Sequence, residues 1–360
     1  MSETVFILGA GASQKAGAPL MKEFLDVAEN LHKNNVVPNA NEDFQLVFDG
    51  CHELRATTTY ANLDLDNIES VFAAFEMAKL LGQLGKLDQG KLNRLPIAMI
   101  KTIVATLEAK ISFPASKRHV RPPNPYEEFV SLIRDLRSNG RAQSVSIITF
   151  NYDLCLDYAL HHNRLPVNYC LGQEGGGDGI KYLKLHGSLN WIKCQGCNQV
   201  VPWNLSDYFQ KYNWNFWDDE SKSVPFHVAS YLANFKHCGE KTSSEPMIVP
   251  PTWNKGAHQN ELKLVWQAAA HELATAENIF IIGYSLPETD QFFRHLYALG
   301  TSLGRARIKR IWVCDPSEQV FGRFKVLLGQ SGISRFHGMR YNFDDAVGFI
   351  RAELRDSIKK

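Results

Sequence analysis

Short apolar runs, each ending in glycine or in polar residues, recur along the chain and predict buried β-strands. The runs cover residues 5–8, 145–150, 180–185, 278–285 and 308–314. Stretches with helical spacing of apolar residues separate most of these runs. The alternation predicts a mainly parallel sheet of the α/β class, with helices on its faces.

Apolar residues also recur at helical spacing through residues 19–112, and this pattern predicts a helical insertion after the first strand. We expect its first helix to begin near Pro19. The insertion either covers a site or only enlarges the core, and the pattern leaves both open. Asp64, Asp66 and Glu69 stand just before one helix and are expected to act as caps and first-turn acids.

These elements predict a doubly wound parallel sheet of Rossmann-like type, with a helical insertion and a small additional module. The predicted domain boundaries follow the changes of pattern along the chain. They place the sheet domain at residues 1–19, 141–193 and 246–345, the helical insertion at 20–140, the small module at 194–245 and a C-terminal helix at 346–360.

Composition adds little to this picture and excludes some partners. The chain has 360 residues, 44% hydrophobic and 21% charged, as in ordinary globular proteins. A net charge of +1 gives no bias towards nucleic acid or a membrane surface. The first residues lack the pattern of a signal peptide, no run is long enough for a membrane span, and seven scattered cysteines suit a reducing compartment. We therefore expect a cytoplasmic protein.

The first strand runs into Gly9-Ala10-Gly11-Ala12-Ser13, a turn of the kind that opens nucleotide sites. Glycines let a pyrophosphate approach the backbone, and a following helix would supply unpaired N–H groups. The turn departs from the dehydrogenase fingerprint, because its sixth position is Gln14 and no second strand ends in an acid about 20 residues later. Hydride transfer is therefore not the first choice.

Polar residues stand at the ends of the other predicted strands, where open α/β sheets bind ligands. They are Asn151 and Asp153, His186, the pair Gly283 and Ser285, and Asp315. This ordered set resembles the sirtuin family of NAD-consuming enzymes, and within it the bacterial sirtuin-like NAD hydrolases of anti-phage defence. The resemblance covers the first strand and residues 145–316.

The resemblance implies a role for each matching position. The turn residues Gly9, Ala10, Gly11 and Ser13 would hold the NAD phosphates, together with Gly283 and Ser285 in a second turn that also serves the ribose. Asn151 and Asp153 would surround the nicotinamide ribose, His186 would be the catalytic histidine, and Asp315 would bind the adenosine side.

The residue types suit cleavage of the bond between ribose and nicotinamide. The amide of Asn151 can position ribose and water, and the imidazole of His186 can accept a proton near neutral pH. Asp153 either orients Asn151 or the ribose, or caps the following helix. Asp315 would repel a 2′-phosphate and favour NAD over NADP. The proposed chemistry requires that the glycine turn, Asn151 and His186 share one crevice.

Cysteines suggest a metal in the small module. Cys194 and Cys197 form a Cys-x-x-Cys half-site, and His237 and Cys238 follow where the family carries its second cysteine pair, which implies a structural zinc ion. The alternative is a metal-free module with an aromatic core. That core would contain Trp191, Trp203, Trp214 and Trp217.

One departure from the family favours water as the acceptor. Deacylating sirtuins continue after the first turn with Pro-Asp-Phe-Arg, whereas here Pro19 leads to residues 20–24 without that acid or arginine. The leading function is thus hydrolysis of NAD to ADP-ribose and nicotinamide. The alternatives are a protein deacylase or ADP-ribosyltransferase, and a noncatalytic NAD- or ADP-ribose-binding subunit. The family also implies a homo-oligomer and a regulatory partner such as a nucleic-acid motor ATPase.

Overall fold

A seven-stranded, all-parallel sheet forms the centre of the computed structural model, in the order β14-β13-β12-β1-β4-β6-β5. The structure describes residues 4–57, 63–116, 119–138, 144–172, 179–212, 223–225, 228, 232, 235–249, 256–288, 290–302 and 308–354. The sheet strands are β1 (Thr4–Leu8), β4 (Val145–Thr149), β5 (Val167–Asn168), β6 (Ile180–Lys184), β12 (Asn278–Ile282), β13 (Arg310–Cys314) and β14 (Phe336–Met339).

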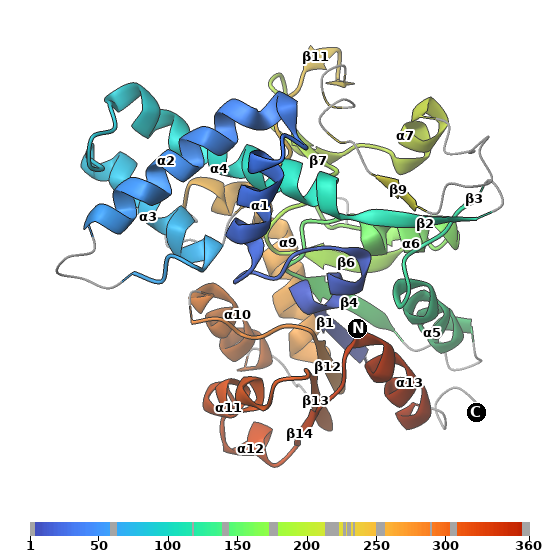
Figure 1. The fold of residues 1–360 in the computed structure, drawn as a ribbon. Helices are drawn as coiled ribbons and strands as arrows, with labels where there is room; N and C mark the ends of the chain where they lie inside the picture. Colours follow the sequence, from blue (N-terminus) through green and yellow to red (C-terminus); the bar gives the residue numbers. More distant parts are fainter. Residues whose placement is uncertain are drawn as a thin grey trace.

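Helices cover both faces of the sheet, which confirms the predicted doubly wound α/β class. Alternate residues of β1 face different cores: Phe6 packs on one side and Ile7 on the other. Figure 1 shows α5 and α13 on the opposite side of the sheet from α10 and α11. The helices that follow or flank the strands are α5 (Tyr126–Ser138), α6 (Cys155–His162), α9 (Gly256–Thr275), α10 (Gln291–Ser302), α11 (Glu318–Leu327), α12 (Gln330–Ile333) and α13 (Phe343–Glu353).

The predicted helical insertion is present and is gathered on one side of the molecule (Figure 1). It consists of α1 (Phe24–Lys33), α2 (Asn41–Thr57), α3 (Ile68–Leu81) and α4 (Gln89–Lys110), with a short 3₁₀ turn η3 (Pro38–Ala40). Helix α5 falls inside the range predicted for this insertion but packs on the sheet, where the Phe129 ring meets Phe6 edge-on at 5.0 Å.

The expected helix start near Pro19 is wrong. The chain after β1 forms two 3₁₀ turns, η1 (Ala10–Ala12) and η2 (Gln14–Ala16), and the first α-helix begins at Phe24. Gly17 ends η2 with φ 99°, a left-handed conformation that glycine adopts without strain. A Cβ there would lie 2.2 Å from the carbonyl oxygen of Lys110, so this turn packs tightly on the end of α4.

The cysteine-bearing segment is built from short antiparallel strands. It contains β7 (Trp191–Lys193), β8 (Val200–Pro202), α7 (Leu205–Tyr212), β9 (Ser223–Pro225), β10 (Lys236–His237) and β11 (Glu240–Lys241). Strand β9 pairs with β2 (Ser112–Ser116), which also pairs with β3 (His119–Val120), so this segment is joined to the end of the insertion. Trp214 and Trp217 lie outside the described residues.

No helix in the described part of the chain is long and apolar enough to cross a membrane.

Candidate active site

The glycine turn lies where the direction in which successive strands are added to the sheet reverses. The chain leaves β1 towards β4 on one side, and leaves β12 towards β13 on the other. Open α/β sheets bind ligands beside such a switch point, at the carboxyl ends of the strands. The two strands meet there through their glycines, because Gly11 donates its N–H to the carbonyl oxygen of Gly283 at 2.9 Å.

Only glycine fits this meeting of two turns. A Cβ on Gly9 would lie 2.5 Å from the carbonyl oxygen of Gly283, and a Cβ on Gly283 would lie 2.6 Å from the nitrogen of Ala12. Gly283 also has φ 61°. Turn-to-turn packing therefore explains these glycines by itself, and their contact with phosphates stays a prediction.

Asn151 extends from the end of β4 onto the glycine turn. Its amide nitrogen donates to the carbonyl oxygen of Gly9 at 2.9 Å and to Ser13 Oγ at 3.1 Å. The side chain is 9% exposed. The structure thus brings together the predicted amide and the predicted glycine turn.

Ser13 is buried and fully engaged. Its hydroxyl donates to Asp153 Oδ2 at 2.6 Å, lies 2.7 Å from the hydroxyl of Tyr126 and accepts from Asn151. Because a hydroxyl has one proton and two lone pairs, Tyr126 must donate to Ser13. Burial first, and then the charge of Asp153, raise the pKa of Tyr126. To bind a phosphate as predicted, Ser13 would have to give up a bond in this network.

Asp153 makes contacts that relate to both of the tasks considered for it, although the N-cap residue of α6 is Leu154. Its Oδ1 accepts from the backbone N–H of Cys155 at 2.9 Å, at the start of α6, and its Oδ2 reaches Asn151 through Ser13. The carboxylate therefore stabilises the helix start and also fixes the group that positions Asn151.

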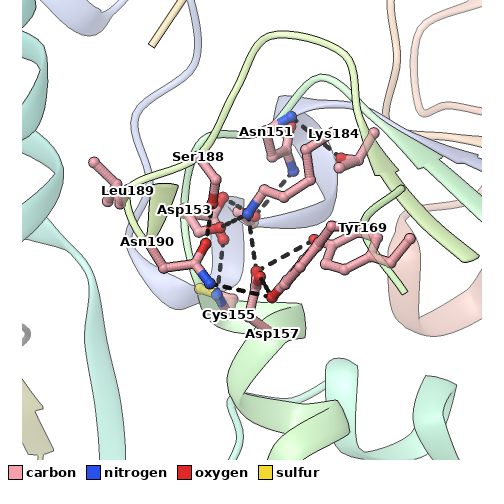
Figure 2. A network of polar contacts seen from close by, with 12 residues as sticks. Asn151, Asp153, Cys155, Asp157, Tyr169, Lys184, Ser188, Leu189 and Asn190 are labelled. Carbon is pink, nitrogen blue, oxygen red and sulfur yellow. Dashed lines mark hydrogen bonds and ion pairs between the residues drawn. The ribbon is translucent and has the colours of Figure 1, made fainter. Parts of the chain in front are cut away.

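A buried lysine from the neighbouring strand reaches this turn (Figure 2). Lys184, at the end of β6, donates to the carbonyl oxygen of Asp153 at 2.7 Å and to Asp157 Oδ2 at 2.9 Å. Both charged side chains are fully buried. Tyr169 donates to the other oxygen of Asp157 at 2.6 Å and accepts from Asn190 at 3.2 Å. The network ties β6 to the β4–α6 turn.

A pocket opens beside these residues, between the sheet edge and the helical insertion. Its empty space is about 580 Å³, including its open mouth. The sheet domain contributes Ala10, Ser13, Ala18, Pro19, Phe150, Asn151, Tyr152 and Asp153, and the insertion contributes Met21, Phe24, Ile68, Glu69, Phe72, Ile103 and Leu107. The insertion therefore covers the site, one of the two possibilities left open by its sequence pattern.

His186 lies beside this pocket but not in its lining. The imidazole is 3% exposed and meets the Phe150 ring edge-on at 5.2 Å, with Tyr152 at 6.2 Å. Its Nε2 lies 3.9 Å from Asp290 Oδ2, which accepts from the hydroxyl of Tyr284 at 2.6 Å.

Ser285 and Asp315 stand on neighbouring turns after β12 and β13, away from the pocket lining. Arg323 joins them, because it donates to the carbonyl oxygen of Ser285 at 3.0 Å and its charge acts on Asp315. Burial raises the pKa of Asp315, whereas the N–H of Ser317 and the charge of Arg323 lower it. Gly283, Ser285 and Asp315 therefore form one edge, adjacent to the glycine turn of β1.

Sequence reasoning missed Glu69 and Asp290. Glu69 was expected only to act as a cap or first-turn acid; it does lie in the first turn of α3, but it is also 5% exposed and lines the pocket. Its surroundings in the sequence gave one signal, since the neighbouring Ile68, Val71 and Phe72 are all apolar. Asp290 follows a predicted strand by five residues, and no pattern linked it to His186.

The predicted metal ligands converge. Cys194 and Cys197 lie between β7 and β8, and His237 and Cys238 lie at the β10–β11 turn. One ligand atom from each residue falls within 4.8 Å of all the others, with Cys194 and Cys238 sulfurs 3.4 Å apart. Backbone N–H groups, that of Cys197 first, lower the pKa of Cys194 to about 6. Three sulfurs and one imidazole nitrogen are a donor set that fits tetrahedral Zn²⁺.

No protein-family model matches the sequence, and no curated protein matches it either. Solved structures resemble it over nearly its whole length. A Sir2 homologue in complex with NAD is 14% identical, with 99% of this chain and 91% of that chain covered, at a TM-score of 0.45. A mutant Sir2 homologue bound to ADP-ribose is 15% identical, with 98% and 94% covered, at a TM-score of 0.43.

A further Sir2 enzyme, from a study of mechanism and regulation, is 14% identical, with 100% of this chain and 94% of that chain covered, at a TM-score of 0.43. At such identities and TM-scores, likeness does not decide activity, which has to be argued from the site itself.

Proposed function

We propose that the protein hydrolyses NAD at the bond between nicotinamide and ribose, giving ADP-ribose and nicotinamide. One observation carries this proposal: the amide of Asn151 and the carboxylate of Asp153 line one pocket, directly beside a glycine turn at the switch point of a parallel sheet. A dinucleotide held at the turn would bring its ribose to these polar groups.

The reaction needs few groups. The C1′–N bond breaks, its electron pair stays on nicotinamide, and a water oxygen bonds to C1′ while the water loses a proton. Asn151 positions ribose and water, since its amide is fixed by Gly9 and Ser13. His186 accepts the proton, and Asp290 stabilises the imidazolium that results. This role requires the ribose to reach the imidazole past Phe150.

The other predicted positions would hold the rest of the dinucleotide. The backbone of Gly9, Ala10 and Gly11 faces the pyrophosphate in this proposal. Gly283, Ser285 and Asp315 form the neighbouring edge and would bind the second phosphate, the ribose and the adenosine side.

The covered pocket supports water as the acceptor. Side chains of α1, α3 and α4 form its apolar wall, where a peptide groove would need an open edge. The cellular role proposed with this activity is NAD depletion in anti-phage defence, in a cytoplasmic homo-oligomer restrained by a partner such as a nucleic-acid motor ATPase. A zinc ion on Cys194, Cys197, His237 and Cys238 would stabilise the small module.

Incubation of the purified protein with NAD alone tests the activity. We expect release of nicotinamide and ADP-ribose without any peptide, and its loss in Asn151→Ala and His186→Ala. Matched controls are Asn93→Ala and His271→Ala, because both side chains are exposed, on α4 and α9. Turnover that appears only with an acylated peptide or an acceptor protein would favour the deacylase or ADP-ribosyltransferase alternative. Saturable binding without turnover would favour a noncatalytic subunit.

A further inference from the structure

Lys184 is a fully buried cation at the end of β6, two residues before His186. The parallel register pairs Lys184 with Thr149, which stands two residues before Asn151 on the neighbouring strand. The two side chains proposed to act on ribose and water therefore follow adjacent strands at the same level of the sheet. Lys184 lies outside the pocket lining, so it can influence the chemistry only through other residues.

The ammonium group of Lys184 binds the turn after β4 (Figure 2). It donates to the carbonyl oxygen of Asp153 at 2.7 Å and to Asp157 Oδ2 at 2.9 Å. The first bond fixes the backbone of the turn, because a carbonyl oxygen cannot shift without its planar peptide unit. The same backbone is held a second time, where the N–H of Leu189 donates to the carbonyl oxygen of Tyr152 at 3.0 Å.

Asp157 connects this ion pair to the loop that follows His186. Tyr169 donates to Asp157 Oδ1 at 2.6 Å and accepts from the side-chain amide of Asn190 at 3.2 Å. The carbonyl oxygen of that amide accepts from Ser188 Oγ at 2.6 Å. One ion pair therefore fixes both of the segments that carry the proposed catalytic groups.

Stability alone is a poor explanation for a fully buried ion pair. Removing two charges from water costs free energy that their attraction has to repay, and apolar residues of similar volume often replace such a pair without loss of stability. A methionine could fill the space of Lys184, but it could not hold the carbonyl oxygen of Asp153. The pair is therefore better suited to fixing the geometry of two turns than to stabilising the fold.

We infer that Lys184 and Asp157 are positioning residues of the proposed NAD cleavage, which hold Asn151 and His186 at the separation that the reaction needs. One of these two groups positions ribose and water, and the other takes the proton of the water, so an error in their spacing slows the step. In the described part of the chain, neither side chain of the pair hydrogen-bonds to the glycine turns proposed to hold the phosphates. This inference rests on the proposed function.

The test uses the double variant Lys184→Met with Asp157→Asn, which leaves no unpaired charge in place of the ion pair. Asparagine keeps an acceptor for Tyr169, whereas the carbonyl oxygen of Asp153 loses its partner. We expect kcat for NAD cleavage to fall on the order of 10²-fold at a temperature where the variant is fully folded. Affinity for ADP-ribose should be unchanged, because the groups proposed to hold its phosphates and adenosine are intact.

Two further variants keep the result interpretable. Lys181→Met is the matched control, because Lys181 stands on the same strand but pairs at 2.6 Å with Glu272 of α9 instead of the β4 turn. It should lower the unfolding midpoint and leave kcat unchanged. Tyr169→Phe deletes one oxygen, keeps the ring and breaks the link between Asp157 and Asn190, so it should lower kcat by a smaller factor than the double variant. Circular dichroism and thermal unfolding identify any variant that fails to fold.

The outcomes separate the two claims. If wild type cleaves NAD and the folded double variant keeps its kcat, the inference is wrong and the proposed function stands. If Lys181→Met loses as much kcat as the double variant, or if the double variant also loses ADP-ribose affinity, the pair only supports the fold or the pocket, and the inference is again wrong. If the double variant does not fold, an unchanged kcat in Tyr169→Phe refutes the inference and a reduced kcat with unchanged ADP-ribose affinity supports it. If wild type neither binds nor cleaves NAD, the proposed function fails, and the inference fails with it.

Discussion

The hydroxyl of Ser13 donates to the carboxylate of Asp153 at 2.6 Å, joining two residues 140 positions apart in the chain. Through this bond the turn after β1 and the turn after β4 become one rigid unit. Asn151 also belongs to this unit, because its amide nitrogen donates to both Ser13 and Gly9. The groups proposed to hold phosphates and ribose are therefore positioned by each other.

Replacement of Ser13 by alanine tests this unit. The change leaves the hydroxyl of Tyr126 and one oxygen of Asp153 without their buried partner, so the free energy of unfolding should fall by about 1–3 kcal/mol. Asn151 would lose one of its two anchors, and kcat for NAD should fall up to about 10²-fold by misplacement. Urea unfolding and a nicotinamide-release assay measure both effects. Unchanged kcat in a destabilised variant would restrict Ser13 to a structural role.

Gly283→Ala probes the contact between the turns of β1 and β12. The added Cβ would meet backbone atoms of Gly11 and Ala12 within 3 Å, in a residue with φ 61°. Overpacking and the left-handed conformation together should cost about 2 kcal/mol or more. Gly322→Ala is the matched control, because a Cβ there meets nothing within 4 Å inside α11, and it should stabilise by about 1 kcal/mol. Thermal unfolding compares the two variants, and equal midpoints would contradict the packing argument.

Sequence reasoning located the central strands because each is a continuous apolar run. It missed β5 and β14, which are short edge strands and are only partly buried. It placed the first helix too early, because nothing in the sequence around Pro19 reveals the tight packing of Gly17 against Lys110. The local pattern of apolar residues identifies which segments are buried. The conformation of this turn depends instead on the contact of Gly17 with Lys110, which is distant in sequence.

The candidate site shows the same division. The sequence could place Asn151, Asp153 and His186 at one edge of the sheet because they follow strands, and parallel strands end at one edge. The pocket position of Glu69 could not be predicted. Helix α3 has buried apolar residues on much of its circumference, so the spacing of its apolar residues does not show which way a first-turn acid points. The engagement of Ser13 by three partners also has no signature in the sequence.

Lys184→Met should destabilise the protein more than any exposed lysine change. Removal of the ammonium leaves Asp157 fully buried without its ion pair, which typically costs about 3–5 kcal/mol. The double variant Lys184→Met with Asp157→Asn removes both charges and should recover part of this loss. Lys309→Met is the control, because its pair with Glu277 is exposed and should be worth about 1 kcal/mol or less. Urea unfolding of wild type and these three variants measures the losses of stability, and a loss for Lys184→Met no larger than that for Lys309→Met would refute the prediction.

Metal analysis tests the cysteine cluster directly. We expect one zinc ion per chain in the wild type and a loss of that ion in Cys238→Ser, since the sulfur of Cys238 lies 3.4 Å from that of Cys194. A chelator should lower the unfolding midpoint of wild type but not of Cys238→Ser. Cys51→Ser is the control, because Cys51 is a buried cysteine on α2 outside the cluster. Zinc-free protein with an unchanged midpoint would leave the aromatic core as the stabilising feature.

Replacement of Asp315 by asparagine should affect the free energy of unfolding and the binding of NAD in different ways. Burial raises its pKa above the ordinary value of 3.8. A folded-state pKa above the unfolded one means that the folded protein binds more protons between the two values, so this carboxyl makes stability fall as the pH rises through that window. Its Oδ1 accepts from the N–H of Ser317 at 2.8 Å, a bond that asparagine can also make.

Asp315→Asn should therefore be at least as stable as wild type at pH 7, with the difference disappearing below about pH 3.8, the ordinary value for this carboxyl. The affinity for NAD, in contrast, should fall in this variant. If Asp315 accepts from the adenosine ribose and repels a 2′-phosphate, the variant should bind NAD more weakly and lose much of its preference over NADP. Calorimetric titration with both dinucleotides, beside unfolding at about pH 3 and pH 7, measures the two effects. An unchanged preference in a fully folded variant would place the adenosine end elsewhere on the sheet edge.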